Sequence, residues 1–234
     1  MTMSSGAVHK GTDGASERLR SLTIRPARAT DAAACASLVF ASGKHEFEFF
    51  LGLRAEQCTE FLKHAFALSQ GRFSWRRHEV AVDAQGEMMA VLAAHDGRRV
   101  AADDLHIVWT LLRYFGPLRA VPMLVRGLVL ETELPKPRRT QTLVAHCATR
   151  ADTRGCGVFS MLFEQALRGA SASTRGLVPS EREVVLDALV SNTRAMALYR
   201  RLGFVELPRK RSRSRFLPAQ LESVRMRLAV GAEK

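Results

Sequence analysis

The stretch "ATRADTRGCGVFSMLFEQAL", residues 148–167, joins a run typical of a strand to a run typical of a helix. Between the two runs lie Arg154, Gly155, Cys156 and Gly157. Two glycines at such a junction let backbone amides surround an anion, and the N-terminal end of the helix adds a partial positive charge. The stretch therefore indicates either a phosphate-binding loop or an ordinary strand-to-helix turn.

Composition is typical of a soluble globular protein. The chain has 234 residues, of which 47% are hydrophobic and 25% are charged, unlike disordered or membrane proteins. This length suffices for one domain with additions. The net charge of +12 indicates either a polyanionic partner or a basic pocket for a multiply phosphorylated ligand. Charge alone does not choose between them.

Cysteine usage and the first residues predict a cytoplasmic protein. Cys35, Cys58, Cys147 and Cys156 form no Cys-x-x-Cys pair, and the opening residues lack the apolar core of a secretion signal. We therefore expect reduced thiols. The seven histidines show no metal-ligand spacing, so no metal site is expected.

Hydrophobic patterning alternates between strands and helices. Residues 1–20 are small, polar and aperiodic, which predicts a flexible tail. We expect strands at 21–27, on both sides of a turn within 78–96, and at 140–149, 183–190, 203–207 and 223–230. We expect helices at 30–42, 55–69, 158–168 and 192–202, and one or two helices within 103–133. This order predicts an α/β sheet with helices on both faces, in a single domain over residues 21–230.

The apolar segment 103–133 is interrupted by Gly116, Pro117 and Pro122. Its charges and prolines argue against a helix that spans a bilayer. It is predicted to pack on the domain, with a helix lying on a membrane surface as the alternative.

A second informative stretch is "NTRAMALYRRLGF", residues 192–204. Asn192 is suited to cap a helix, and Ala195 and Leu198 form a face that can pack on the sheet. Tyr199 directly follows Leu198, so it lies beside this face on the helix. Taken alone, such a tyrosine is usually a packed residue with its hydroxyl hydrogen-bonded.

Together, the two stretches resemble the GNAT superfamily, the N-acetyltransferases that depend on acetyl-coenzyme A. The family pattern is R-x-x-G-x-G/A, a helix, a strand and N-x-x-A-x-x-L-Y-x-x-x-G-F. The first motif matches at Arg154 and Gly157. The second motif matches at Asn192, Ala195, Leu198, Tyr199, Gly203 and Phe204. Phe159 stands where the family usually has a small residue that lets a pyrophosphate approach the backbone, so it either turns into the helix packing or weakens cofactor binding.

The resemblance implies a GNAT fold, with a central mixed sheet of six to seven strands that is splayed between strands 4 and 5. It makes 103–133 a helical insertion that serves as a lid or as a dimer surface. The implied activity is transfer of the acetyl group of acetyl-coenzyme A to a primary amine, on a small molecule or a peptide, by direct attack in a ternary complex. The alternative is a GNAT-like regulatory module that binds acyl-coenzyme A without turnover.

The resemblance also implies roles for individual residues. The amides of the glycine loop would hold the coenzyme A pyrophosphate, and the strand at 147–149 would pair with the pantetheine arm. The backbone amide of Cys147 becomes the oxyanion donor and Tyr199 the general acid for the departing thiol. The implied cofactor contacts are Cys147, Ala148, Thr149, Arg154, Gly155, Cys156, Gly157, Val158, Phe159, Ser160, Asn192 and Tyr199.

The general base is not identified by the family pattern. His146 is a candidate, although strand alternation should point it away from the face that carries Cys147. Glu46 and Glu48 are further candidates, and water relays could replace all three.

The stretch "PRKRSRSRF", residues 208–216, has five basic residues between positions 209 and 215. A solvated loop is the ordinary interpretation and nucleic-acid binding the alternative. Because no aromatic residues are interleaved with the charges, no nucleic-acid partner is expected.

Overall fold

The computed structural model describes residues 22–172, 182–208 and 214–229. The tail predicted for residues 1–20 and most of the basic run at 209–215 lie outside these ranges. Within the described ranges, no helix is long and apolar enough to cross a membrane.

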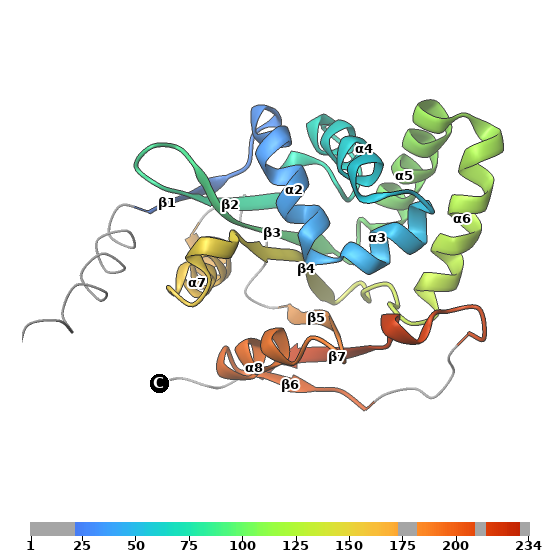
Figure 1. Ribbon diagram of the computed structural model, residues 1–234. Helices are drawn as coiled ribbons and strands as arrows, with labels where there is room; N and C mark the ends of the chain where they lie inside the picture. The colour runs from blue at the N-terminus through green and yellow to red at the C-terminus, as the bar shows by residue number, and fades with distance from the viewer. Residues whose placement is uncertain (1–21, 173–181, 209–213, 230–234) are drawn as a thin grey trace, which may run out of the picture.

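The described strands form one seven-stranded sheet in the order β1-β2-β3-β4-β5-β7-β6 (Figure 1). Their bounds are β1 Thr23–Pro26, β2 His78–Val82, β3 Met88–Asp96, β4 Gln141–Thr149, β5 Glu183–Leu189, β6 Phe204–Glu206 and β7 Ser223–Leu228. All neighbours are antiparallel except β4 and β5, which are parallel. The predicted mixed α/β sheet is therefore confirmed.

Helices cover both faces of this sheet. Their bounds are α2 Ala32–Ser42, α3 Lys44–Leu51, α4 Ala55–Ala67, α5 Val100–Phe115, α6 Pro117–Glu131, α7 Val158–Ala172 and α8 Thr193–Arg201. Figure 1 shows α2 to α6 on one side of the sheet and α7 on the other. Met196 and Tyr199 of α8 share a buried cluster with Phe159 and Leu162 of α7, so α8 covers the same face as α7.

The segment predicted as interrupted helix is a hairpin of two helices. Gly116 has a φ of 78° and ends α5, and Pro117 then begins α6. A proline suits the first position of a helix because its missing N–H has no helical partner there. Pro122 lies inside α6 and does not break this helix, contrary to the prediction.

Helix α3 was not predicted as a helix. It is eight residues long and ends at Gly52, which has a φ of 64°. Phe47 and Leu51 are its buried residues. A helix of two turns offers too few periodic positions for its pattern to stand out in the sequence.

Candidate active site

Strands β4 and β5 pair over only part of their length. The parallel register runs from Gln141 opposite Glu183 to Val144 opposite Leu186, whereas β4 continues to Thr149. Beyond Val144, the edge of β4 that faces β5 has no strand partner among the described residues. The splay expected between strands 4 and 5 is therefore present, and it makes a strand edge available to an extended ligand.

A β-bulge lies at the point where the strands part. The register places one residue of β3, Leu92, opposite two residues of β4, His146 and Cys147. His146 has a φ of 52° and is the one non-glycine residue with a positive φ in the described ranges. Such backbone is rare outside glycine and concentrates at functional sites. The two side chains lie on opposite faces, because His146 stacks on Phe73 whereas Cys147 packs against the other core cluster.

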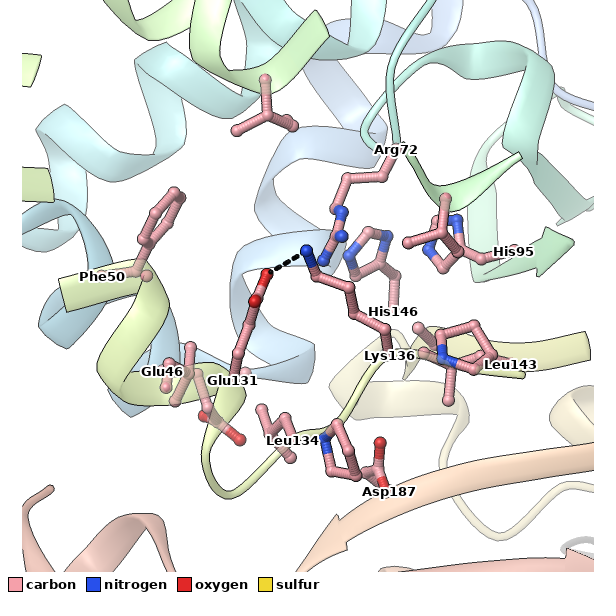
Figure 2. Close-up of a pocket in the computed structure, with 18 of the residues that line it drawn as sticks. Glu46, Phe50, Arg72, His95, Glu131, Leu134, Lys136, Leu143, His146 and Asp187 are labelled. Carbon is pink, nitrogen blue, oxygen red and sulfur yellow. Dashed lines mark ion pairs between the residues drawn. The ribbon is translucent and has the colours of Figure 1, made fainter. Parts of the chain in front are cut away.

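A cavity of about 490 Å³ opens beside this bulge (Figure 2). It is lined by His146 and Cys147 of β4, by Tyr199 of α8, and by residues of β3, β5, α3, α5 and α6. Two sequence-predicted residues, Cys147 and Tyr199, are thus brought to the same space as a candidate base. Ion pairs and apolar side chains form the rest of the wall.

Tyr199 and Cys147 meet at one end of the cavity. Tyr199 is 8% exposed, and its hydroxyl shares a hydrogen bond with the Cys147 side chain. The Cys147 thiol in turn donates to the carbonyl oxygen of Ala145, with an Sγ–O distance of 3.7 Å. Burial raises the pKa of Tyr199 well above its usual value and raises that of Cys147 to about 12. Both groups are therefore protonated at neutral pH, so Tyr199 can act as a proton donor while Cys147 is a poor nucleophile.

Three histidines lie at the other side of the bulge: His78 and His95 are buried and His146 is half-buried. His78 Nδ1 is 2.8 Å from the carbonyl oxygen of Ser74, which can only accept, so Nδ1 carries the hydrogen. His78 Nε2 lies 3.0 Å from His146 Nδ1, and the planes of the two rings differ by only 11°. Because Nε2 of a neutral His78 accepts, His146 Nδ1 must donate. A neutral His146 that carries its hydrogen on Nδ1 has its lone pair on Nε2. We therefore assign Nε2 as the atom that can accept a proton.

Burial keeps the three imidazoles neutral. It lowers the pKa of His78 to about 4 and those of His95 and His146 well below the usual value. The His95 ring lies edge-on to His146, with 5.4 Å between centroids. The described residues contain no group of His, Cys, Asp and Glu side chains that could hold a metal ion.

The glycine loop has the geometry of an anion-binding turn. Gly155 and Gly157 have φ values of 85° and 83°, which other residues adopt only with strain. Helix α7 then begins at Val158, and the amides of its first turn have no helical partner. The Arg154 side chain donates through Nε to the carbonyl oxygen of Thr149 at 3.2 Å, which ties the loop to the end of β4.

Phe159 does not cover this loop. It is 7% exposed and stacks on Phe163, with 6.3 Å between ring centroids. Its ring also lies 6.4 Å from that of Tyr199. Of the two alternatives for this departure from the family pattern, the structure shows the side chain turned into the packing between α7 and α8.

The remaining predicted cofactor residues lie along the same path. Asn192 caps α8, accepting a hydrogen bond from the amide of Ala195 at 3.1 Å, so its side-chain oxygen is already used. Ala148 faces the core and can offer only its backbone. Cys156 is a half-buried free thiol, and Ser160 lies half-buried in the first turn of α7.

The structure distinguishes the two glutamates that are candidates for the general base. Glu46 lines the cavity, whereas Glu48 does not and instead pairs with His45 at 3.7 Å. Burial raises the pKa of Glu46. His78, which orients His146, was missed because no sequence spacing links residues of β2 and β4.

Neither a protein-family model nor a curated protein matches the sequence. Several solved structures, however, have a similar fold. An N-acetyltransferase from Staphylococcus aureus Mu50 is 17% identical, with a TM-score of 0.65 over 88% of this chain and 98% of that one. A histone acetyltransferase HPA2 and related acetyltransferase from Corynebacterium glutamicum is 22% identical, with a TM-score of 0.54 over 89% and 96%. An agmatine N-acetyltransferase is 19% identical, with a TM-score of 0.51 over 88% and 98%.

These likenesses extend over nearly the whole length of each solved structure, and at such identities they concern the fold. They agree with the mixed sheet, the parallel pair β4–β5 and the helices on both faces. The chain therefore has the GNAT fold of the N-acetyltransferases.

Proposed function

We propose that this protein is an N-acetyltransferase that transfers the acetyl group of acetyl-coenzyme A to a primary amine by direct attack. The observation that carries the proposal is the cavity at the parting of β4 and β5, which holds Cys147, Tyr199 and His146 together. The likeness to solved acetyltransferases supports the same class of reaction.

The residues around the splay fit coenzyme A. Positive φ values at Gly155 and Gly157 open the loop to a pyrophosphate, and Phe159 is turned away from it. The free edge of β4 at 147–149 would hold the pantetheine arm as an added strand. Bound there, acetyl-coenzyme A supplies an acyl group that is activated as a thioester.

Three groups of the chain would divide the proton and charge transfers. His146 Nε2 accepts the proton of the attacking amine, and His78 holds the opposite ring nitrogen in the donating form. The backbone amide of Cys147 donates to the carbonyl oxygen of the thioester, where charge develops. Tyr199 gives its proton to the departing thiolate, replacing its hydrogen bond to Cys147. His78 is therefore a positioning residue in this scheme.

The sharpest test of the acid is Tyr199→Phe. Loss of a general acid should lower kcat about a hundredfold while the Kd for acetyl-coenzyme A changes little. Thiol release on mixing with amines gives kcat, and titration calorimetry gives the Kd. The matched control is Tyr114→Phe, which alters the only other tyrosine of the chain, a partly exposed residue of α5 outside the cavity.

An unchanged kcat in Tyr199→Phe would remove this residue from the mechanism. Acetyl-coenzyme A binding with no turnover for any amine would instead favour the acyl-coenzyme A binding module.

A further inference from the structure

The cavity is acidic although the protein is strongly basic. Its lining holds five carboxylates and two cationic side chains, a formal charge of −3 with the histidines neutral, in a chain whose net charge is +12. The carboxylates are Glu46, Asp103, Asp104, Glu131 and Asp187, and the cations are Arg72 and Lys136. With Arg77 and Arg225, which pair with two of these carboxylates from outside the lining, the formal charge is −1. A negative charge left within a basic protein favours a cationic ligand in this cavity.

Four of the five carboxylates are neutralised by ion pairs. Asp103 pairs with Arg77 at 2.7 Å, and Asp187 pairs with Arg225 at 2.7 Å. The other two share Lys136, which lies 2.7 Å from Asp104 and 3.2 Å from Glu131; Asp104 also pairs with Arg72.

Glu46 forms no ion pair in the part of the chain that the structure describes. Its Oε2 is buried and has no hydrogen-bond partner there.

A second polar group of the cavity also lacks a partner. His95 is 6% exposed and lines the cavity, and its Nδ1 has no hydrogen-bond partner among the described residues. Buried polar groups in folded proteins are almost always hydrogen-bonded. Both atoms belong to residues that line the cavity, so a ligand bound there could complete the hydrogen bonding of both.

The two groups stand at different ends of the cavity. Figure 2 shows Glu46 on one side of the drawn space, beside Phe50, and His95 with His146 on the other. Apolar side chains of α3, α5 and α6 lie among the lining residues, including Phe47, Leu124 and Leu128. Such a wall suits an alkyl or aryl body, and phenyl rings also attract a nearby cation.

Resting on the proposed function, we propose that the acceptor is an amine that carries a second cationic group, as an alkyl diamine does. Its reacting nitrogen lies at His146, within reach of His95, and its second, protonated nitrogen pairs with the Glu46 carboxylate. The body between them packs on the apolar wall. Glu46 is in this scheme a specificity-determining residue, and the base is His146.

Three acceptors of equal length test this subsite: hexane-1,6-diamine, 6-aminohexan-1-ol and 6-aminohexanoate. Each presents a primary amine at one end, and the far ends are cationic, neutral and anionic; the two equivalent amines of the diamine account for a factor of about two by themselves. We expect kcat/KM for the diamine to exceed that for the amino alcohol about tenfold to a hundredfold, and the amino acid to be the poorest acceptor. Diamines of four to eight carbons should show an optimum length, set by the span from His146 to Glu46.

The matched variants are Glu46→Gln and Glu48→Gln, on the same helix and with the same change of charge. Glu46→Gln should bring the ratio of diamine to amino alcohol to within about twofold, because the charge it recognises is gone. Glu48→Gln should keep the wild-type ratio, because Glu48 does not line the cavity. Thermal melts establish that both variants are folded before their ratios are compared.

Equal kcat/KM for the three acceptors, or a ratio unchanged by Glu46→Gln, would overturn the diamine subsite and leave the acetyltransferase proposal standing. If no amine is acetylated, the proposed function fails, and calorimetry still decides the subsite. In that case, tighter binding of hexane-1,6-diamine to the wild type than to Glu46→Gln supports the diamine subsite. Equal binding to both proteins, or no binding, overturns the subsite.

Discussion

The two sides of the proposed active site are built in different ways. On the proposed cofactor side, the groups come from two continuous stretches, 147–160 and 192–199, and most of them are backbone amides or a strand edge. On the proposed acceptor side, the groups are side chains from β2, β3, β4, α3, α5 and α6, which meet only in the folded chain. A backbone site depends on φ and ψ, whereas a side-chain site depends on the identity of each residue.

This difference has a consequence for mutation. Side-chain changes on the proposed acceptor side should remove activity or alter specificity, because each chemical group there is provided by one side chain. Apart from the proposed acid Tyr199, side-chain changes on the proposed cofactor side should be tolerated wherever the backbone keeps its path. Two adjacent residues, His146 and Cys147, lie on the two sides of this division and allow a direct comparison.

The largest effect is expected for His146→Gln. Removing the proposed base should lower kcat about a hundredfold to ten-thousandfold, with little change in the Kd for acetyl-coenzyme A. Thiol release at saturating amine measures kcat, and calorimetry measures the Kd. His64→Gln, at an exposed histidine of α4, is the control. A kcat within a few-fold of the wild type would assign the base to water or to another residue and weaken the comparison.

The buried histidines also predict how stability depends on pH. Burial lowers the pKa of His78 to about 4, below the value of about 6.5 in an unfolded chain, so the unfolded chain binds the proton first. This contribution to stability is complete above pH 6.5 and is lost as the pH falls towards 4, to a total of about 3 kcal/mol. Urea unfolding at pH 7, 6 and 5 should show a loss of stability that is smaller in His78→Gln.

Here too His64→Gln is the matched control and should retain the wild-type dependence on pH. Equal slopes in the wild type and in His78→Gln between pH 7 and 5 would contradict the buried, neutral state of His78.

The same division explains what the sequence could and could not predict. The glycine loop, the cap at Asn192 and the helices that follow them are local, because each depends on contacts between residues a few positions apart. Tyr199 could be assigned a role because a motif of contiguous residues identified it. The local structure on the proposed cofactor side could therefore be predicted from the sequence.

The proposed acceptor side could not be predicted from the sequence, for physical reasons. The contact between His78 and His146 joins residues 68 positions apart, and no spacing rule reports such a pair. The bulge that gives His146 its positive φ interrupts the alternation on which strand predictions rest. Glu46 and Glu48 are equivalent by type and by helix, and only the packing of α3 brings one of them into the cavity. Side-chain sites of this kind follow from tertiary structure alone.

The smallest effect is expected for Cys147→Ala. The proposed role of this residue lies in its backbone amide, and burial raises the pKa of its thiol to about 12, so the thiol is protonated and poorly nucleophilic. Removing the sulfur frees the Tyr199 hydroxyl from one partner but leaves the amide in place. We expect kcat within about threefold of the wild type, against a loss of at least a hundredfold for the adjacent His146→Gln.

A large loss in Cys147→Ala would reverse this reading, because it would place the side chain itself in the reaction. Intact-mass spectrometry of the wild type, quenched during turnover, would then show an acetylated cysteine if the thiol attacks the thioester. An unmodified mass together with a small effect on kcat would assign the function of this position to its main chain. The difference between the two neighbours would then be one between a donor fixed by the strand and a base that depends on its side chain.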